Sequence, residues 1–439
     1  MKKLITPFLT LLILLTSAPS KAQQLPKPAL VGYWETWTNL KLTQINASYN
    51  VINVAFPSTA NGSDCNMQFT APWFYSVNAF KADMQTLQNQ GKKILLSIGG
   101  AADPIYLDDY KQRDTFVNTM NTILDNYPFD GIDIDLETSS LAFSNVTIAN
   151  PTDSGLVYII DAIKKVLGHY QTSHNKRCLL TMAPEILYVQ GAIGVNGGNG
   201  QYLPIIDALR NDLDLLMVQL YNAGNSVGVD GWGGQILYPN TSDYIIGLTE
   251  AVILGFDVKL SGMQNEHFYG LPASKVAIGL PSCANAGGKY TDTNKVRRAV
   301  KYLMGIGPKP EIYTLKNSSA YPDLGGFMTW SIQKDANCTT TPANSFVRNY
   351  TSIFGGVGVY EEELQTSNFY IYPNPSQQNI VININELNAN TTLQIVELSG
   401  AVVHEKQLTQ NQEMIDISSL AAGLYFVKIG QNVQKLIVE

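Results

Sequence analysis

Short apolar runs alternate with amphipathic stretches from about residue 28 to residue 355. Apolar runs of this length between helical patterns are typical of parallel strands that are covered on both faces. The eight candidate strands are Leu30–Trp34, Val51–Phe56, Ile94–Ile98, Gly131–Glu137, Cys178–Met182, Leu213–Tyr221, Val276–Leu280 and Phe327–Ile332. They predict a (β/α)8 TIM barrel of the α/β class. An open doubly wound sheet is the alternative, but its glycine-rich phosphate turn is missing after the first strand.

The stretches between the runs carry apolar residues at helical spacing. The clearest example has one continuous apolar face, which consists of Leu156, Ile159, Ile160, Ile163, Val166 and Leu167. Asn294–Gly305 and Phe346–Phe354 show the same pattern less cleanly. These stretches predict the helices that cover the barrel.

The pattern changes after Gly355. Residues 356–367 are typical of a linker, and a strict alternation of apolar and polar positions begins at Ile380–Ile384. Further short strands are expected at Thr391–Glu397, Ala401–Gln407, Gly423–Ile429 and Val433–Val438. Residues 368–439 therefore predict a small all-β, Ig-like sandwich that follows the barrel.

The first residues predict export. Lys2 and Lys3 precede the apolar run Leu4–Leu15, and small residues lead to Ala22. This order is that of a signal peptide spanning residues 1–22. The run is too short to span a bilayer, and no other candidate membrane span follows.

Charge and cysteine content narrow the range of partners. The net charge is −7 without a basic stripe, which argues against nucleic acid as a partner. The four cysteines allow three pairings, between which the sequence does not choose. No histidine or cysteine spacing fits a metal site, so we expect neither a metal nor a cofactor. We also expect a monomer.

One candidate strand carries an unusual run of acids, FDGIDIDLET at Phe129–Thr138. Side chains alternate along a strand, so Asp133, Asp135 and Glu137 share one face while the apolar residues between them share the other. In a barrel the apolar face packs under the helices. The acids must then point inward and follow one another toward the C-terminal mouth.

Three neighbouring buried carboxylates cannot all ionise cheaply, so this group is expected to keep a proton. Glu137 lies nearest the mouth and is the expected general acid. A calcium loop would need glycine where Thr138 stands, and a phosphatase DxDx(T/V) start has no glutamate at its fifth position. A solvent-facing edge strand is the remaining alternative, which the apolar partners oppose.

The segment DGIDIDLE, Asp130–Glu137, resembles the DxxDxDxE signature of the glycoside hydrolase family 18 chitinases. Other segments resemble strands of that family in the same order: Gly32–Trp34, Ser97–Gly100, Met182–Glu185, Gln219–Asn222 and Gly325–Ile332. The resemblance covers residues 28–355. It implies a secreted chitinase that cleaves β-1,4 bonds between N-acetylglucosamine units with retention, by substrate-assisted catalysis through an oxazolinium intermediate.

The resemblance also implies residue roles. Glu137 would protonate the glycosidic oxygen, and Asp135 would hold the acetamido N–H of the reacting sugar. Asp133 would share a proton with Asp135. Tyr221 would donate to the acetamido carbonyl, and Trp330 would form the floor beneath the sugar.

Further candidates for substrate contact lie at strand ends and among the aromatic residues: Gln219, Asn222, Met182, Met217, Tyr33, Phe56 and Trp37. The segment between the seventh and eighth strands is short and helix-like, and the α+β insertion that walls a deep tunnel in processive members of the family is not expected. The resemblance therefore implies an open groove and non-processive cleavage.

The tail has a resemblance of its own. YPNPS at Tyr372–Ser376, AAGLYFVKI at Ala421–Ile429 and the closing KLIVE are similar to the type IX secretion sorting domain. This implies the type IX secretion machinery as a partner and an extracellular or cell-surface location.

Two other functions share the motif. An endo-β-N-acetylglucosaminidase that cuts N-glycans uses the same signature and mechanism. A chitin-binding lectin on the same barrel commonly lacks the terminal glutamate, which is present here as Glu137.

Overall fold

The computed structural model describes residues 23–439 except 62–64, 145, 194–198, 260–264, 356–368, 385–386, 388–390, 398–399 and 431. The expected signal peptide and linker lie outside the described residues. The chain divides into two compact units, with the boundary between Gly356 and Val357. Each unit is described by itself.

The first unit is built on eight parallel strands in the order β13-β14-β1-β2-β5-β6-β7-β8. Their bounds are β1 (Ala29–Glu35), β2 (Val51–Ala55), β5 (Lys93–Gly100), β6 (Gly131–Leu136), β7 (Leu179–Met182), β8 (Leu215–Leu216), β13 (Ala277–Pro281) and β14 (Gly326–Trp330). Every expected strand is confirmed, although the sixth is regular over only two residues. Two backbone bonds close the barrel beside it: Leu220 N donates to Gly279 O at 2.9 Å, and Gly279 N donates to Val218 O at 3.2 Å.

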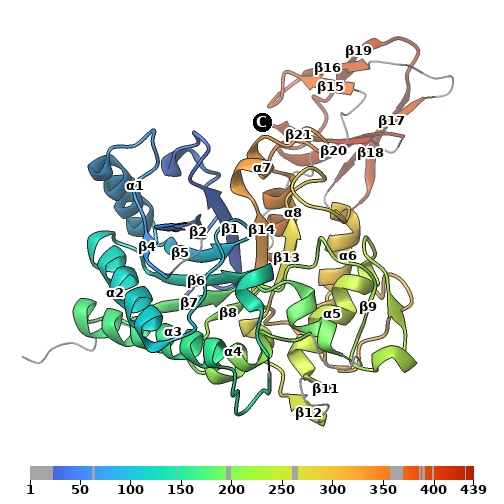
Figure 1. Cartoon of the computed structure of the whole chain (residues 1–439). Coiled ribbons are helices and arrows are strands. Elements are labelled where there is room, and N and C mark those ends of the chain that lie inside the picture. The colour runs from blue at the N-terminus through green and yellow to red at the C-terminus, as the bar shows by residue number, and fades with distance from the viewer. Residues whose placement is uncertain are drawn as a thin grey trace, which may run out of the picture. The chain divides into compact units, whose positions relative to one another are not determined.

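Helices surround these strands (Figure 1). They are α1 (Val77–Asn89), α2 (Tyr110–Asn126), α3 (Ser154–His174), α4 (Leu203–Ala208), α5 (Ser242–Leu254), α6 (Thr293–Leu303), α7 (Ile332–Ala336) and α8 (Ser345–Phe354). Side chains of Ser76, Asp109, Asp153 and Thr241 accept bonds from first-turn N–H groups, which fixes where four helices begin. The expected helices correspond to α3, α6 and α8.

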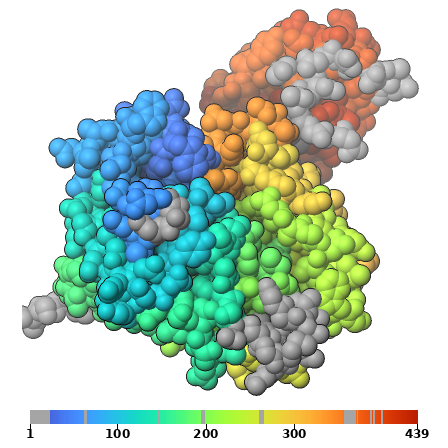
Figure 2. Space-filling view, viewed as in Figure 1, coloured from blue at the N-terminus to red at the C-terminus, as the bar shows by residue number. Residues whose placement is uncertain are grey.

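Short strand pairs occupy the loops: β3 (Ser58–Thr59) with β4 (Met67–Gln68), β9 (Ser226–Val227) with β10 (Ile236–Leu237), and β11 (Phe256–Lys259) with β12 (Asn265–Phe268). Residues 282–325, between β13 and β14, are all described and form α6 without any strand. In the space-filling view, the segments around β1 to β5 and those around α5 and α6 lie on opposite sides of this unit (Figure 2). No helix in the described part of the chain is long and apolar enough to cross a bilayer.

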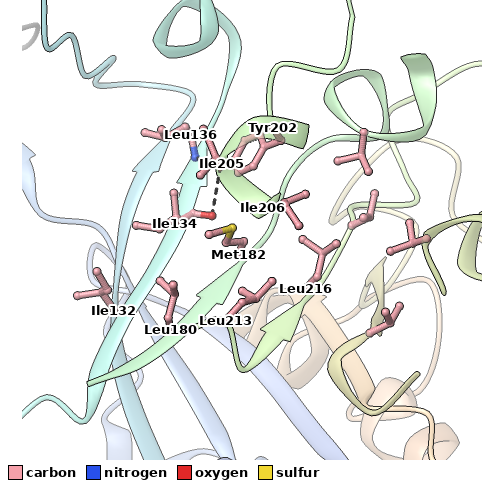
Figure 3. Packing of buried hydrophobic residues seen from close by; sticks show 14 of the residues in the cluster. Ile132, Ile134, Leu136, Leu180, Met182, Tyr202, Ile205, Ile206, Leu213 and Leu216 are labelled. Atoms are coloured by element: carbon pink, nitrogen blue, oxygen red, sulfur yellow. Dashed lines mark hydrogen bonds between the residues drawn. The ribbon is translucent and has the colours of Figure 1, made fainter. Parts of the chain in front are cut away.

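Strand β6 has one apolar face and one acidic face, as its alternation predicts. Ile132, Ile134 and Leu136 belong to the large cluster between strands and helices. Ile134 and Leu136 lie near Tyr202 and Ile205, where α4 begins (Figure 3). Tyr202 locks this face, because its hydroxyl donates to Ile134 O at 3.3 Å and accepts from Leu136 N at 2.7 Å. Burying each of these aliphatic side chains contributes about 1.5–3 kcal/mol. That burial holds the strand in the register that turns the acids inward.

The second unit is a sandwich of two antiparallel sheets, in the orders β15-β16-β19 and β18-β17-β20-β21. The bounds are β15 (Phe369–Tyr372), β16 (Asn379–Ile384), β17 (Thr392–Glu397), β18 (Val402–Gln407), β19 (Gln412–Asp416), β20 (Gly423–Ile429) and β21 (Asn432–Val438). Both sheets contribute to one apolar cluster, for example through Ile382 and Val427. The all-β expectation is confirmed, with β15 and β19 as strands that the pattern did not predict.

Candidate active site

The deepest acid of β6 is held by hydroxyl groups from three other strands. Asp133 is fully buried. Its carboxylate accepts bonds from Tyr33 Oη at 2.6 Å, Ser97 Oγ at 2.7 Å and Thr181 Oγ1 at 2.5 Å. Burial raises the pKa of Asp133, and these three hydrogen bonds oppose that rise.

The next two acids share one amide. Gln219 Nε2 donates to Asp135 Oδ1 at 2.9 Å, to Glu137 Oε1 at 3.1 Å and to Ala183 O at 2.9 Å. An NH2 group has two hydrogens for these three acceptors. The carboxylates of Asp135 and Glu137 therefore converge on one donor and compete for it.

Both of these carboxyl groups hold protons more tightly than usual. Burial, followed by the charges of Glu137 and Asp133, raises the pKa of Asp135 well above its ordinary range. Burial also raises the pKa of Glu137. The Gln219 hydrogen bond acts in the opposite direction on both. The arrangement can therefore keep a proton at the barrel mouth, which is what a general acid requires.

These residues border a cavity of about 230 Å³. Its lining consists of Tyr33, Phe56, Gly100, Ala101, Asp135, Glu137, Gln219, Tyr221, Asn222, Ala286 and Trp330. Tyr221 is buried, and the pKa of its hydroxyl is raised well above the ordinary value, first by burial and then by Asp135 and Glu137. Its hydroxyl therefore remains a hydrogen-bond donor beside the two acids.

Aromatic rings form one side of the cavity. Trp330 stacks on Phe56, with ring centroids 6.0 Å apart and planes 13° apart, and contacts Tyr33 at 5.6 Å. Trp37 is not part of the lining, but it continues the stack from Phe56 at 6.3 Å and is 53% exposed. Rings with one open face suit the apolar face of a sugar.

The loop that follows β13 contributes Ala286 to the lining. Asn222 N donates to Gly288 O at 3.0 Å, and Asn222 Oδ1 accepts from Gly288 N at 2.6 Å. A disulfide joins Cys283 in this loop to Cys338, which settles one pairing that the sequence left open. Cys65 and Cys178 are buried. Asn222 thus borders the cavity and also fixes its wall.

Two predicted contact residues lie away from the cavity. Met182 is fully buried in the outer layer, among Leu180, Leu213 and Leu216 (Figure 3). Its neighbour Thr181 points inward to Asp133, so strand alternation turns Met182 outward. Met217 lies inside the barrel, in the buried interior cluster, and does not line the cavity. The expectation that these two methionines touch substrate is therefore corrected.

Glu185 is an acid of this site that the sequence reasoning did not single out. Burial, followed by the charge of Glu137, raises its pKa, and the backbone N–H of Thr138 donates to its carboxylate. It lines a second cavity, of about 360 Å³, which shares Tyr221 and Asn222 with the first. Its place in MAPE, directly after a strand end, was the available signal.

The residues that the structure describes contain no group of three or more histidine, cysteine, aspartate or glutamate side chains that could hold a metal ion.

Each of the two units matches a known protein family. Residues 29–319 match the sequence profile of Glycosyl hydrolases family 18, and residues 370–439 match that of the Secretion system C-terminal sorting domain. The second match marks the chain as a secreted protein. The crystal structure of a family GH18 chitinase from Chromobacterium violaceum has 32% identity and a TM-score of 0.65, covering 74% of this chain and 82% of that chain.

Curated relatives carry related names. Chitinase Chi52 of Paenibacillus xylanexedens is 39% identical, covering 70% of this chain and 58% of its own length. Chitinase D of Niallia circulans is 36% identical, with 76% and 63% covered. The chain thus spans about three fifths of these two proteins. A Probable class II chitinase of Arthroderma benhamiae is 33% identical, with 67% and 90% covered. The chain therefore belongs to glycosyl hydrolases family 18.

Proposed function

We propose that the protein is a secreted chitinase that hydrolyses β-1,4 bonds between N-acetylglucosamine units with retention of configuration. The observation that carries this proposal is the convergence of Asp135 and Glu137 on Gln219 Nε2 at the edge of an aromatic cavity. Family membership and the catalytic glutamate support an enzyme over a lectin.

The first chemical step uses the proton kept at the barrel mouth. Glu137 gives its proton to the bridging oxygen as the glycosidic bond breaks. The carbonyl oxygen of the substrate's own 2-acetamido group attacks the anomeric carbon and forms an oxazolinium ion. In the second step, water attacks that carbon as its bond to the acetamido oxygen breaks, and the Glu137 carboxylate takes a proton from the water.

The neighbouring residues position the acetamido group. Asp135, when ionised, accepts the acetamido N–H and stabilises the positive charge on the oxazolinium ring. The Tyr221 hydroxyl donates a hydrogen bond to the acetamido oxygen, and its raised pKa keeps the hydroxyl protonated for this role. Intramolecular attack is fast only when the nucleophile is held in line, so these contacts supply effective molarity.

The floor and the base of the site have separate roles. Trp330 packs beneath the reacting sugar, and Phe56 and Tyr33 support the indole ring. Asp133, with its three hydroxyl donors, can take a share of the proton when Asp135 turns toward the substrate. The lack of strands in residues 282–325 supports an open groove and non-processive cutting.

Product analysis tests the proposal. The purified full chain is incubated in parallel with colloidal chitin and with a high-mannose glycoprotein. We expect diacetylchitobiose and other soluble oligomers from chitin, initially as the β-anomer, and no trimmed glycoprotein. If the glycan is released from the glycoprotein and chitin is not cleaved, the protein is an endo-β-N-acetylglucosaminidase instead. Binding of chitin without any product would make it a lectin. Gel filtration of the same sample tests the expected monomer.

A further inference from the structure

The second cavity adjoins the proposed catalytic cavity, and the two share Tyr221 and Asn222. Glu185 lines the second cavity, and after burial the charge of Glu137 raises the pKa of Glu185. Under the proposed function, the sugar beyond Glu137 is the leaving group. The second cavity is then the place where the leaving-group sugar lies.

The chemistry of this second cavity is acidic. Glu185 is half-buried, and no lysine or arginine is among the described residues that line the cavity. Asp135 and Glu137 interact electrostatically with Glu185, and neither adds a positive charge. A partly desolvated carboxylate without a cation close by is stabilised by a positively charged ligand group.

Other lining groups suit a sugar. Gln190 is 1% exposed, and its Oε1 has no partner among the described residues, although Nε2 donates to Leu248 O at 3.1 Å. Trp232 is 52% exposed, and its Nε1 donates to Ile193 O at 3.1 Å, which fixes the indole at the rim. The cavity wall thus contains a buried amide oxygen without a described partner, a fixed aromatic ring and one carboxylate.

We propose that this cavity selects a glucosamine unit with a free amino group as the leaving-group sugar, through an ion pair between its ammonium and Glu185. This rests on the proposed function and narrows its substrate to partly deacetylated chitin. The reacting sugar still needs its acetamido group as nucleophile, so a preferred cleavage site is N-acetylglucosamine followed by glucosamine.

The products record this preference directly. Each cleavage leaves the reacting sugar at a new reducing end and the leaving-group sugar at a new non-reducing end. The full chain is therefore incubated with randomly acetylated chitosan at a pH at which the amine is protonated and Glu185, whose pKa is raised, is still ionised. The product ends are then sequenced. We expect glucosamine at new non-reducing ends about two- to fivefold above its share in the polymer, the effect of a partly exposed ion pair.

Variants assign the preference to one carboxylate. Glu185→Gln should bring the glucosamine share at new non-reducing ends to that of the polymer, and Glu185→Asp should keep part of the enrichment. Asp108→Asn, which removes an exposed carboxylate from the loop after β5, is the matched control and should keep all of it. Added salt should reduce the wild-type enrichment. The end composition is a ratio within one reaction, so a change in overall rate from a variant does not affect it.

Three results would overturn the proposal: no enrichment in the wild type, an enrichment that Glu185→Gln leaves intact, or an enrichment one unit inside the new reducing end instead. Failure of the underlying function is distinguishable, because it would appear as no cleavage of fully acetylated chitohexaose by the wild type.

Discussion

Gln219 Nε2 is the contact that joins the acids of the site, since Asp135 and Glu137 both accept from it. A donor to a carboxylate favours the charged form and lowers its pKa. Burial raises the pKa of both acids, so Gln219 sets how far that rise goes. The sequence placed Gln219 near the substrate but gave no sign of this contact, because the pairing joins side chains from β6 and from the segment after β8.

Replacing Gln219 with leucine should shift the pH dependence of catalysis. Without the amide donor, the charged form of Glu137 loses stabilisation and its pKa rises. The general acid then stays protonated to higher pH, so the alkaline limb of the kcat/KM profile should move up by about one pH unit, the equivalent of one hydrogen bond to a charged group. Gln171→Leu, at an exposed position of α3, should leave the profile unchanged. A downward shift, or none, would contradict the role given to Gln219.

Asp135→Asn should stabilise the fold while it removes most activity. The raised pKa of Asp135 means that the folded state resists ionisation. Its penalty is absent below the pKa of the unfolded chain and grows as the pH rises toward the folded-state pKa. At neutral pH we expect the variant to gain about 1 kcal/mol in the free energy of unfolding.

Denaturant titrations at acidic and neutral pH measure this effect. The gain from Asp135→Asn should be smaller at acidic pH. A variant that is less stable than the wild type at neutral pH would show that the buried charge does not oppose folding.

Among the elements, strand alternation decides which residues reach the site. On β6 the acids and aliphatic residues differ so clearly that the inward face could be predicted from the sequence. On β7, Thr181 and Met182 are consecutive residues of an apolar run, and nothing in the sequence says which side chain points inward. Thr181 bonds to Asp133, and Met182 consequently packs under α4. In the segment after β8, Met217, Gln219 and Tyr221 alternate onto the inward side. Met217 is buried in the barrel interior, whereas Gln219 and Tyr221 line the cavity.

A glycine at the end of β5 makes room for the aromatic floor. Gly100 has φ 81°, and a Cβ at this position would lie 2.8 Å from the Phe56 ring. Gly100→Ala should therefore displace Phe56, lower kcat/KM on chitin oligomers several-fold and destabilise the fold by about 1 kcal/mol or more.

Gly168→Ala is the matched control. Gly168 is exposed within α3, and a Cβ there would meet nothing within 4 Å. It should stabilise the fold by about 0.5–1 kcal/mol without changing kcat/KM. Equal kcat/KM values for the two variants would show that the position of Phe56 does not affect substrate binding or cleavage.

At the scale of the whole molecule, the chain has two units with separate apolar cores. Composition shift and changed periodicity after Gly355 were enough to predict them. The pairing of Cys283 with Cys338 was not predictable, because it depends on how the loop after β13 approaches the segment after α7. The residues proposed for catalysis all lie in the first unit.

Truncation after Ser367 should separate catalysis from export. Since the proposed site draws nothing from residues 368–439, the purified shorter chain should cleave soluble chitin oligomers with kcat/KM within about twofold of the full chain. In cells that have the secretion system, the shorter chain should remain with the cells and be missing from the culture medium. Loss of activity on soluble oligomers would make the sandwich part of the catalytic machinery.

The central claim is that Glu137 supplies the proton that breaks the glycosidic bond. Glu137→Gln keeps the shape of the side chain but has no acidic proton. The decisive measurement is single-turnover cleavage of chitohexaose by this variant, with binding followed in parallel by calorimetry. We expect a rate loss of about 10²–10⁴-fold with a Kd within a few-fold of the wild type. Cleavage at a near-normal rate would contradict the account.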